Sequence, residues 1–379
     1  MVYTGIDRVR DGEYARLFQG RRLGLLTNHS GVDRQLHSTI DLLHERFHLT
    51  ALFAPEHGVR GADQAGLASQ NQRDGRTGVP IYSLFRADGH GMTEEMLDSF
   101  DTLVYDIQDV GSRLYTYPGS LKECMQQLGP LGKPVVVLDR PNPLGCGVDG
   151  KLREKELYGF SAFHNIPARY GLTIGELADM MNREDGLGCD LSVVPMKGYQ
   201  REMFYQDTGL FYVNPSPNLP TLDGVALYNG TCLFEGTAIS EGRGTTRPFE
   251  ILGAPWIDPY RTADRMNALE MPGVRFRPVW FIPMFSKHAG HSCGGVQIHV
   301  SDPRAVKGFE TGLRLLLEMK EQTLEQGRDF WLEGSGTGYL AGSLEVLQPD
   351  FDRRLDGFLD RCAREQREYL PRADAFRIY

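Results

Sequence analysis

The sequence has few cysteines, and their spacing gives them no evident structural or metal-binding role. Its 379 residues include six cysteines, none in a C-x-x-C pair or at a Cys/His spacing typical of a zinc site. A chain of this length can bury a large core, so it needs no disulfide or metal ion for stability. We therefore expect buried free thiols, no metal and no cofactor.

Long apolar runs and an excess of positive charge are also missing. No stretch reaches the roughly 18 apolar residues of a membrane span, and the N-terminus has no apolar signal core. We therefore expect a cytoplasmic protein as given, or an exported or periplasmic one if a leader was removed. The net charge of −9, with no Lys/Arg-rich run, argues against nucleic acid as a partner.

The first half alternates short apolar runs with helical patterns. This alternation predicts an α/β fold, with a Rossmann-like parallel sheet covered by helices on both sides. One run, Val135-Val136-Val137, has the continuous apolar character of a strand buried on both faces. The predicted strands are residues 23–26, 49–54, 79–84, 102–107, 134–138 and 191–195, and the predicted helices are 38–46, 93–100, 120–128 and 174–182.

The second half is less regular. Residues 205–259 show little periodicity and much Gly, Pro and Asn, which is typical of long loops that line a site. We expect two domains, a Rossmann-like domain over residues 1–165 and a second α/β (α+β) domain over 166–379, with the active site in the cleft between them. Order returns in the second domain with a predicted strand at 295–300 and predicted helices at 306–322 and 353–368.

Polar side chains follow four of the predicted strands. The carboxyl ends of parallel strands meet at one edge of a sheet, which is where ligands bind in open α/β folds. The sequence has no G-x-G-x-x-G, no phosphate-binding P-loop and no G-x-S-x-G elbow, so neither a nucleotide site nor a serine nucleophile is favoured. The candidate substrate-binding residues at this edge are Asn28, Arg60, Gln108, Arg113, Arg140 and Asn142.

Glu56 is the leading catalytic candidate. It follows an apolar strand and stands before His57 and two nearby glycines. A carboxyl group at such a rim can have its pKa raised by desolvation, as a general acid near neutral pH requires. His57 could hydrogen-bond Glu56 or the substrate. The alternatives are that Glu56 caps a helix or pairs with Arg60, and that His57 is structural.

Acid–base catalysis often pairs two carboxylates whose environments differ. Asp106 and Glu241 are the catalytic candidates, although Asp106 could instead stabilise a turn with Asp109. The glycine-rich segment 231–250 lets the backbone approach a ligand closely, but its charged residues could also form structural ion pairs. Further substrate-binding candidates in the second half are Asn218, Glu235 and Arg243.

Two other classes of function remain open. A non-catalytic protein that binds sugars or peptides could use the same cleft. A metal-dependent hydrolase could use His29, His57, Asp106 and Asp109, although no ligand spacing supports it strongly.

Several motifs, taken in order from about Gly24 to Asp302, resemble one family. They include LLTNHSG, LFAPEHGVRG, VPIYSL, VVVLDRPNPLG, VNPSPNLPT and CGGVQIHVSD. They are similar to the exo-acting β-N-acetylmuramidases, glycoside hydrolase family 171, formerly a domain of unknown function. The resemblance implies a Rossmann-like domain without a dinucleotide, a second domain closing over a cleft, and release of N-acetylmuramic acid from the non-reducing ends of peptidoglycan fragments. It also implies that Glu56 and His57 are the catalytic pair.

Overall fold

The first part of the chain forms a seven-stranded sheet in a computed structural model that describes residues 1–56, 58–60, 72–86, 89–157 and 163–379. The strand order is β3-β4-β2-β1-β7-β8-β9, and neighbours are parallel except for β3 and β4. A separate hairpin pairs β5 with β6. The strands are β1 (Arg22–Thr27), β2 (His48–Ala54), β3 (Gln72–Arg73), β4 (Pro80–Ser83), β5 (Phe85–Arg86), β6 (Gly89–His90), β7 (Thr102–Asp106), β8 (Val135–Leu138) and β9 (Leu191–Val194).

The six parallel strands have the order of a Rossmann sheet. The chain moves outward from β1 through β2 to β4, then returns to place β7 beside β1 and continues to β8 and β9. At the centre, Leu25 is paired with Leu52 on one side and Val104 on the other. This order confirms the predicted fold class, and its switch point lies between β1 and β7.

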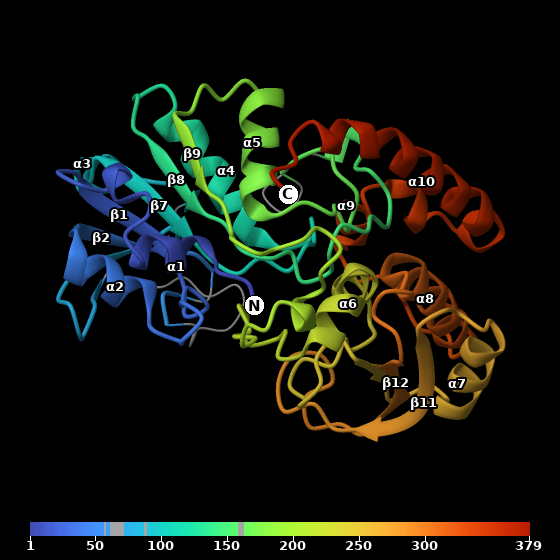
Figure 1. Ribbon diagram of the computed structural model, residues 1–379. Helices are drawn as coiled ribbons and strands as arrows, with labels where there is room; N and C mark the ends of the chain where they lie inside the picture. The colour runs from blue at the N-terminus through green and yellow to red at the C-terminus, as the bar shows by residue number, and fades with distance from the viewer. Residues whose placement is uncertain (57, 61–71, 87–88, 158–162) are drawn as a thin grey trace.

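Helices cover both faces of this sheet (Figure 1). Ile6 and Ile40 pack from α1 and α2 against one face, while Met96 and Leu121 pack from α3 and α4 against the other. Thr93 caps α3, because its side chain accepts a hydrogen bond from the Met96 amide at 3.4 Å. The helices are α1 (Gly5–Arg10), α2 (Thr39–Arg46), α3 (Glu94–Asp98), α4 (Thr116–Leu128) and α5 (Ile174–Glu184), with short 3₁₀ turns at Ala15–Leu17, Lys155–Leu157 and Tyr205–Asp207.

The first domain extends beyond residue 165, so the expected boundary is corrected. β9 is hydrogen-bonded to β8 over four residue pairs, and α5 packs against both strands. After β8 the chain continues to α5 and then adds β9, the last strand of the sheet. Residues 166–194 therefore belong to the sheet domain.

The second domain is built on a three-stranded antiparallel sheet in the order β10-β12-β11. Its helix α6 crosses α8 at two glycines, where a Cβ on Gly230 would lie only 1.9 Å from the Gly308 carbonyl oxygen. The absence of side chains lets these two helices approach each other closely. The elements are α6 (Leu222–Thr231), a 3₁₀ turn (Cys232–Gly236), β10 (Ile251–Ala254), α7 (Pro259–Ala268), β11 (Val274–Phe281), β12 (Cys293–Val300), α8 (Gly308–Glu325), α9 (Thr337–Ala341), a 3₁₀ turn (Leu344–Leu347) and α10 (Phe351–Asp374).

Two elements of this domain escaped the sequence analysis. Every residue of α6 from Gly224 to Thr231 is buried, so the helix has no polar face and shows no period of 3.6. β11 does alternate, with Val274 buried and Arg275 exposed, but Pro278 interrupts the pattern of a strand.

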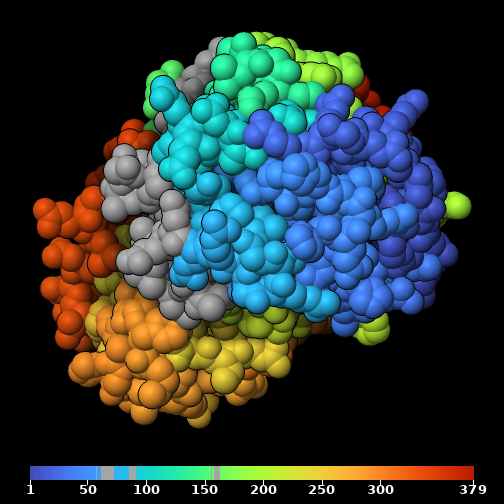
Figure 2. All heavy atoms as spheres, turned by 90° about the vertical axis from the view of Figure 1, so that its left-hand side faces the viewer, coloured from blue at the N-terminus to red at the C-terminus, as the bar shows by residue number. Residues whose placement is uncertain are grey.

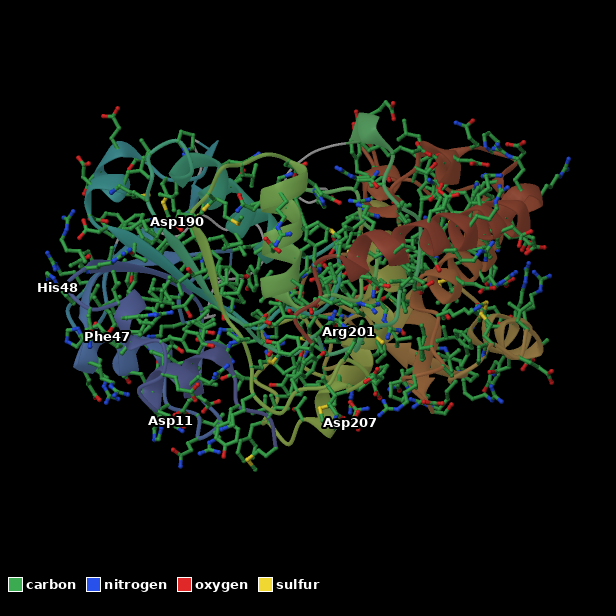
Figure 3. The ribbon with its side chains drawn as sticks, turned by 45° about the horizontal axis from the view of Figure 1, so that its top comes forward. Asp11, Phe47, His48, Asp190, Arg201 and Asp207 are labelled. Carbon is green, nitrogen blue, oxygen red and sulfur yellow. The ribbon has the colours of Figure 1, made fainter. Side chains whose placement is uncertain are left out.

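The carboxyl ends of the first sheet face the second domain. In Figure 3, His48, the first residue of β2, and Asp190, which precedes β9, lie at the edge of the sheet away from the second domain. Arg201 lies on the side towards that domain. Figure 2 views the first domain from the side on which the strands begin, with the second domain below it. α10 runs back to the first domain, where the Tyr379 hydroxyl donates to Asp139 at 2.8 Å. Among the described helices, none has the length and apolar character needed to cross a bilayer.

Candidate active site

The loops after β1 and β7 are tied to each other at the switch point. Thr27 Oγ1 donates to the Asp106 carbonyl at 2.6 Å, and the Gln108 amide donates to Ser30 Oγ at 3.0 Å. Asn28 and Gln108 are both buried, and their side-chain amides donate to the carbonyls of Pro215 and Pro141. The structure therefore places these two predicted substrate-binding residues inside the framework of the site.

Asp106 is held in a buried ion pair. Its two carboxylate oxygens lie 2.6 Å from Nε and 2.8 Å from Nη2 of Arg140, and both side chains are buried. Asn142, also predicted to bind substrate, donates to the Leu172 carbonyl and accepts from the Leu144 amide. These contacts favour a structural role for all three residues over contact with a ligand.

Glu56 follows the carboxyl end of β2 and is only partly buried. Thr116, the first residue of α4, donates its hydroxyl to Glu56 Oε2 at 2.9 Å. The Tyr117 hydroxyl lies 3.3 Å from the Glu56 carbonyl oxygen. The start of α4 thus orients both the side chain and the backbone of Glu56. His57 lies outside the described residues.

The proline-rich loop of the second half packs on these strand ends. A ring nitrogen of His29 lies 2.6 Å from the Asn214 carbonyl oxygen, and the Tyr117 hydroxyl donates to the Pro215 carbonyl at 2.8 Å. Asn218 is buried, and its Nδ2 has no hydrogen-bond partner among the residues that the structure describes. This loop brings a polar amide from the predicted list to the same region as Glu56.

Four alternating charges follow α6. Arg243 Nη2 lies 2.6 Å from Glu235 Oε1, and Arg243 Nε lies 3.1 Å from Glu241 Oε1. The other oxygen of Glu241 lies 2.8 Å from Nζ of Lys287. The side chain of Glu241 is 2% exposed, whereas that of Glu235 is 33% exposed. Of the two acids, Glu235 is the one that a ligand can reach.

Electrostatics distinguish these groups further. Burial raises the pKa of Glu235; Arg243 opposes the rise and Glu241 adds to it. Burial tends to lower the pKa of Arg243, but Glu235 and Glu241 raise it above its ordinary value. Glu235 is therefore poised to hold a proton more readily than an ordinary glutamate.

Aromatic contacts connect the Glu56 region to this charged cluster. The rings of Tyr117 and Tyr115 have centroids 4.7 Å apart, and those of Tyr115 and Tyr228 lie 6.1 Å apart. Tyr228 in turn contacts Phe249 at 4.9 Å, and the Arg243 guanidinium lies over the Phe249 ring at 5.1 Å. A series of buried aromatic contacts thus connects Tyr117, which lies beside Glu56, to Arg243 in the glycine-rich segment.

The remaining predicted arginines differ in their partners. Arg60 pairs with Asp74 instead of Glu56. Arg113 is fully buried, and its Nε and Nη1 have no hydrogen-bond partner among the described residues. Burial, helped by repulsion from Arg153, lowers the pKa of Arg113 to about 9. Arg113 is thus a cation without an acidic partner in the described part of the chain.

Thr116 and Lys287 are two site residues that the sequence analysis missed. Thr116 is the first residue of α4, four residues before the predicted start of that helix. The sequence has no capping residue at position 115 that would have shown the helix to begin there. Lys287 lies 46 residues after Glu241, and no local pattern joins them. In the described part of the chain, no group of three His, Cys, Asp or Glu side chains is arranged to hold a metal ion.

Fold and site together define a two-domain α/β enzyme whose accessible acids lie at the carboxyl edge of a parallel sheet and on a facing glycine-rich segment. Models of the N-terminal and C-terminal domains of the exo-beta-N-acetylmuramidase NamZ match residues 23–223 and 226–379. The chain therefore belongs to the NamZ exo-beta-N-acetylmuramidase family and is a glycosidase, as the motifs indicated.

Individual relatives agree with this assignment. The peptidoglycan beta-N-acetylmuramidase NamZ of Bacillus subtilis (strain 168) is 46% identical over 318 residues, which cover 83% of this chain and 76% of the relative. The crystal structure of a DUF1343 family protein (BF0371) from Bacteroides fragilis NCTC 9343 matches with a TM-score of 0.89 and 34% identity. A second such protein (BF0379) from the same organism matches with a TM-score of 0.79 and 29% identity. Each match covers 100% of this chain and 99% of the other.

Proposed function

We propose that this protein releases N-acetylmuramic acid from the non-reducing ends of peptidoglycan fragments, with Glu56 as the general acid. The observation that carries the proposal is the partly exposed Glu56 carboxylate, held by Thr116 at the carboxyl edge of the sheet, in a chain of this family. The Bacillus subtilis relative is named for action on peptidoglycan.

The hydrogen bond from Thr116 gives Glu56 a defined direction. A general acid must lie within hydrogen-bond reach of the leaving oxygen, so its orientation matters as much as its pKa. Because the hydroxyl fixes one carboxyl oxygen, the group cannot rotate freely about its terminal bond. This restriction favours proton transfer along a single path.

Glycoside hydrolysis usually needs a second carboxylate, and the geometry favours Glu235 over Asp106 and Glu241. Asp106 binds Arg140 with both oxygens, and Glu241 is buried between two cations. Glu235 is a third exposed. A separation of ~5 Å from Glu56 would correspond to retention and ~6.5–9.5 Å to inversion. The acetamido group of the substrate is the alternative nucleophile.

Muramic acid carries a lactyl carboxylate that glucosamine lacks, and an arginine would bind it through two parallel charge-assisted bonds. Arg243 is the first candidate because it lies beside Glu235 and is partly exposed. Its two carboxylate partners would have to share it with the substrate. Arg113, which has no acidic partner among the described residues, is the second candidate.

The test is hydrolysis of a chromogenic β-glycoside of N-acetylmuramic acid by wild-type protein and by Glu56→Gln. Losing the general acid should lower turnover by ~10²-fold or more. Glu45→Gln, on the exposed end of α2, is the matched control and should keep full activity.

The outcomes separate the candidate functions. A wild-type protein that binds the glycoside but releases no chromophore would be a sugar-binding protein. An unimpaired Glu56→Gln variant would reject the role of Glu56, while leaving the glycosidase in place.

A further inference from the structure

Lys287 stands in the centre of a ring of backbone carbonyl groups. Its Nζ donates to the carbonyl oxygens of Phe234 at 2.7 Å, Ile239 at 2.8 Å and Thr237 at 3.0 Å, and lies 3.3 Å from that of Glu235. The same ammonium group is 2.8 Å from Glu241 Oε2. The Lys287 ammonium group therefore binds both the backbone of segment 234–241 and the buried carboxylate of Glu241.

The loop that delivers Lys287 is itself held in an unfavourable conformation. The two residues beside it, Ser286 and His288, both have positive φ angles, at 69° and 58°. Such angles are unfavourable for a residue other than glycine and persist only where the surroundings enforce them. Here His288 Nε2 lies 2.7 Å from the Ala238 carbonyl oxygen, and the Met284 amide donates to the Gly244 carbonyl at 2.9 Å.

Three ion pairs in series connect the Lys287 ammonium group to the accessible acid, Glu235. Lys287 contacts Glu241, Glu241 contacts Arg243, and Arg243 contacts Glu235. Charges alternate along this series, so each group is held by its neighbours on either side. Only the last carboxylate, Glu235, is substantially exposed.

We propose that Lys287 is a positioning residue for hydrolysis, which fixes the position of Glu241 and, through Arg243, that of Glu235. The inference rests on the proposed function, in which Glu235 faces the substrate. Lys287 itself touches neither the substrate nor the leaving group. Its effect is carried by the ion pairs and by the carbonyl ring.

Removing the ammonium group has a defined consequence. The converging carbonyl oxygens lose their shared donor, and Glu241 keeps only Arg243 as a cation. Arg243 would then be drawn towards Glu241 and away from Glu235. A displacement of about 1 Å in a catalytic group can cost on the order of 10²-fold in rate, so kcat should fall by that order while KM changes little.

The experiment uses Lys287→Met and Lys287→Cys in the full chain, assayed with the chromogenic muramic acid glycoside. Alkylating Lys287→Cys with 2-bromoethylamine forms a thioether that restores an ammonium group at nearly the original distance, with bromide leaving. Most of kcat should return, whereas alkylation with neutral iodoacetamide should not restore it. Treated wild-type protein controls for modification of Cys146, the one native cysteine that is not fully buried. Lys307→Met, at an exposed lysine of the same domain, should keep full activity.

The possible results either support or overturn the inference. An unchanged kcat in Lys287→Met would overturn it. So would a loss of kcat that the restored ammonium group does not reverse, or melting of both variants below the assay temperature, which would make Lys287 a folding residue only. If wild-type protein itself fails to cleave the glycoside, the proposed function fails instead, and the two failures are distinct.

Discussion

Replacing Arg140 with Met tests whether Asp106 is structural or catalytic. The substitution keeps an unbranched apolar stem but removes both guanidinium contacts to the fully buried Asp106 carboxylate, at 2.6 and 2.8 Å. A buried ion pair that loses one partner typically destabilises a protein by 3–5 kcal/mol, because the other charge is left uncompensated. We expect a loss of about that size. The assay is urea unfolding, with kcat measured on the fraction that remains folded.

The double variant Asp106→Asn/Arg140→Met sharpens the test. Once the buried charge is gone, the missing guanidinium should matter less, so the double variant should be more stable than the sum of the two single effects predicts, by about 1–3 kcal/mol. Asn still offers a carbonyl oxygen to the Thr39 hydroxyl, which donates to Asp106. The structural interpretation fails if Arg140→Met costs under ~1 kcal/mol, or if kcat collapses while stability is kept.

Two further predictions concern a buried acid and the recognition of the substrate. Burial raises the pKa of Asp109 from 3.8 to about 6, against hydrogen bonds from Tyr170 and Gly111. The folded state then holds a proton on Asp109 that the unfolded state has lost, so Asp109 should lower stability by up to ~3 kcal/mol as pH rises from 4 through 6. The buried Asp139, with a pKa of about 7, adds to this fall, so Asp109→Asn should make the fall in pH-dependent thermal melts shallower, and an unchanged slope would contradict the raised pKa of Asp109. Arg243→Ala should reduce cleavage of a muramic acid glycoside more than that of the glucosamine analogue, by ~10-fold or more for a lost charge-assisted pair; equal losses would show that Arg243 does not read the lactyl group.

Much of the first domain could be predicted from local patterns. Buried parallel strands consist of short apolar runs, so β1, β2, β7, β8 and β9 were each predicted to within two residues at either end. Capping also has a local signature, since Thr173 and Glu176 have the spacing of a capping box and form one at the start of α5. The predicted domain boundary was wrong because a strand belongs to the sheet in which it pairs. β8 and β9 lie too far apart in the sequence for any local pattern to show that they pair.

The site was predictable only in part, because burial and pairing are tertiary properties. Glu56 could be placed at a strand end from sequence, but the hydroxyl that orients it comes from Thr116, sixty residues later. Asp106 and Glu56 look alike in sequence, since each follows an apolar run. Only the structure shows that Arg140 binds both oxygens of Asp106.

The polar residues of the switch point mostly bind one another, so the accessible acids lie away from the centre of this sheet. In a dinucleotide-binding fold, the loops at that point leave backbone amides facing a ligand. Here the side-chain amides of Asn28 and Gln108 donate to the carbonyl groups of neighbouring loops, and the Asp106–Arg140 pair lies beside them. Gln108 Oε1 has no hydrogen-bond partner among the described residues, but the other groups bind one another and have little left to offer a ligand. The accessible acids accordingly lie one strand away at Glu56, and across the domain interface at Glu235.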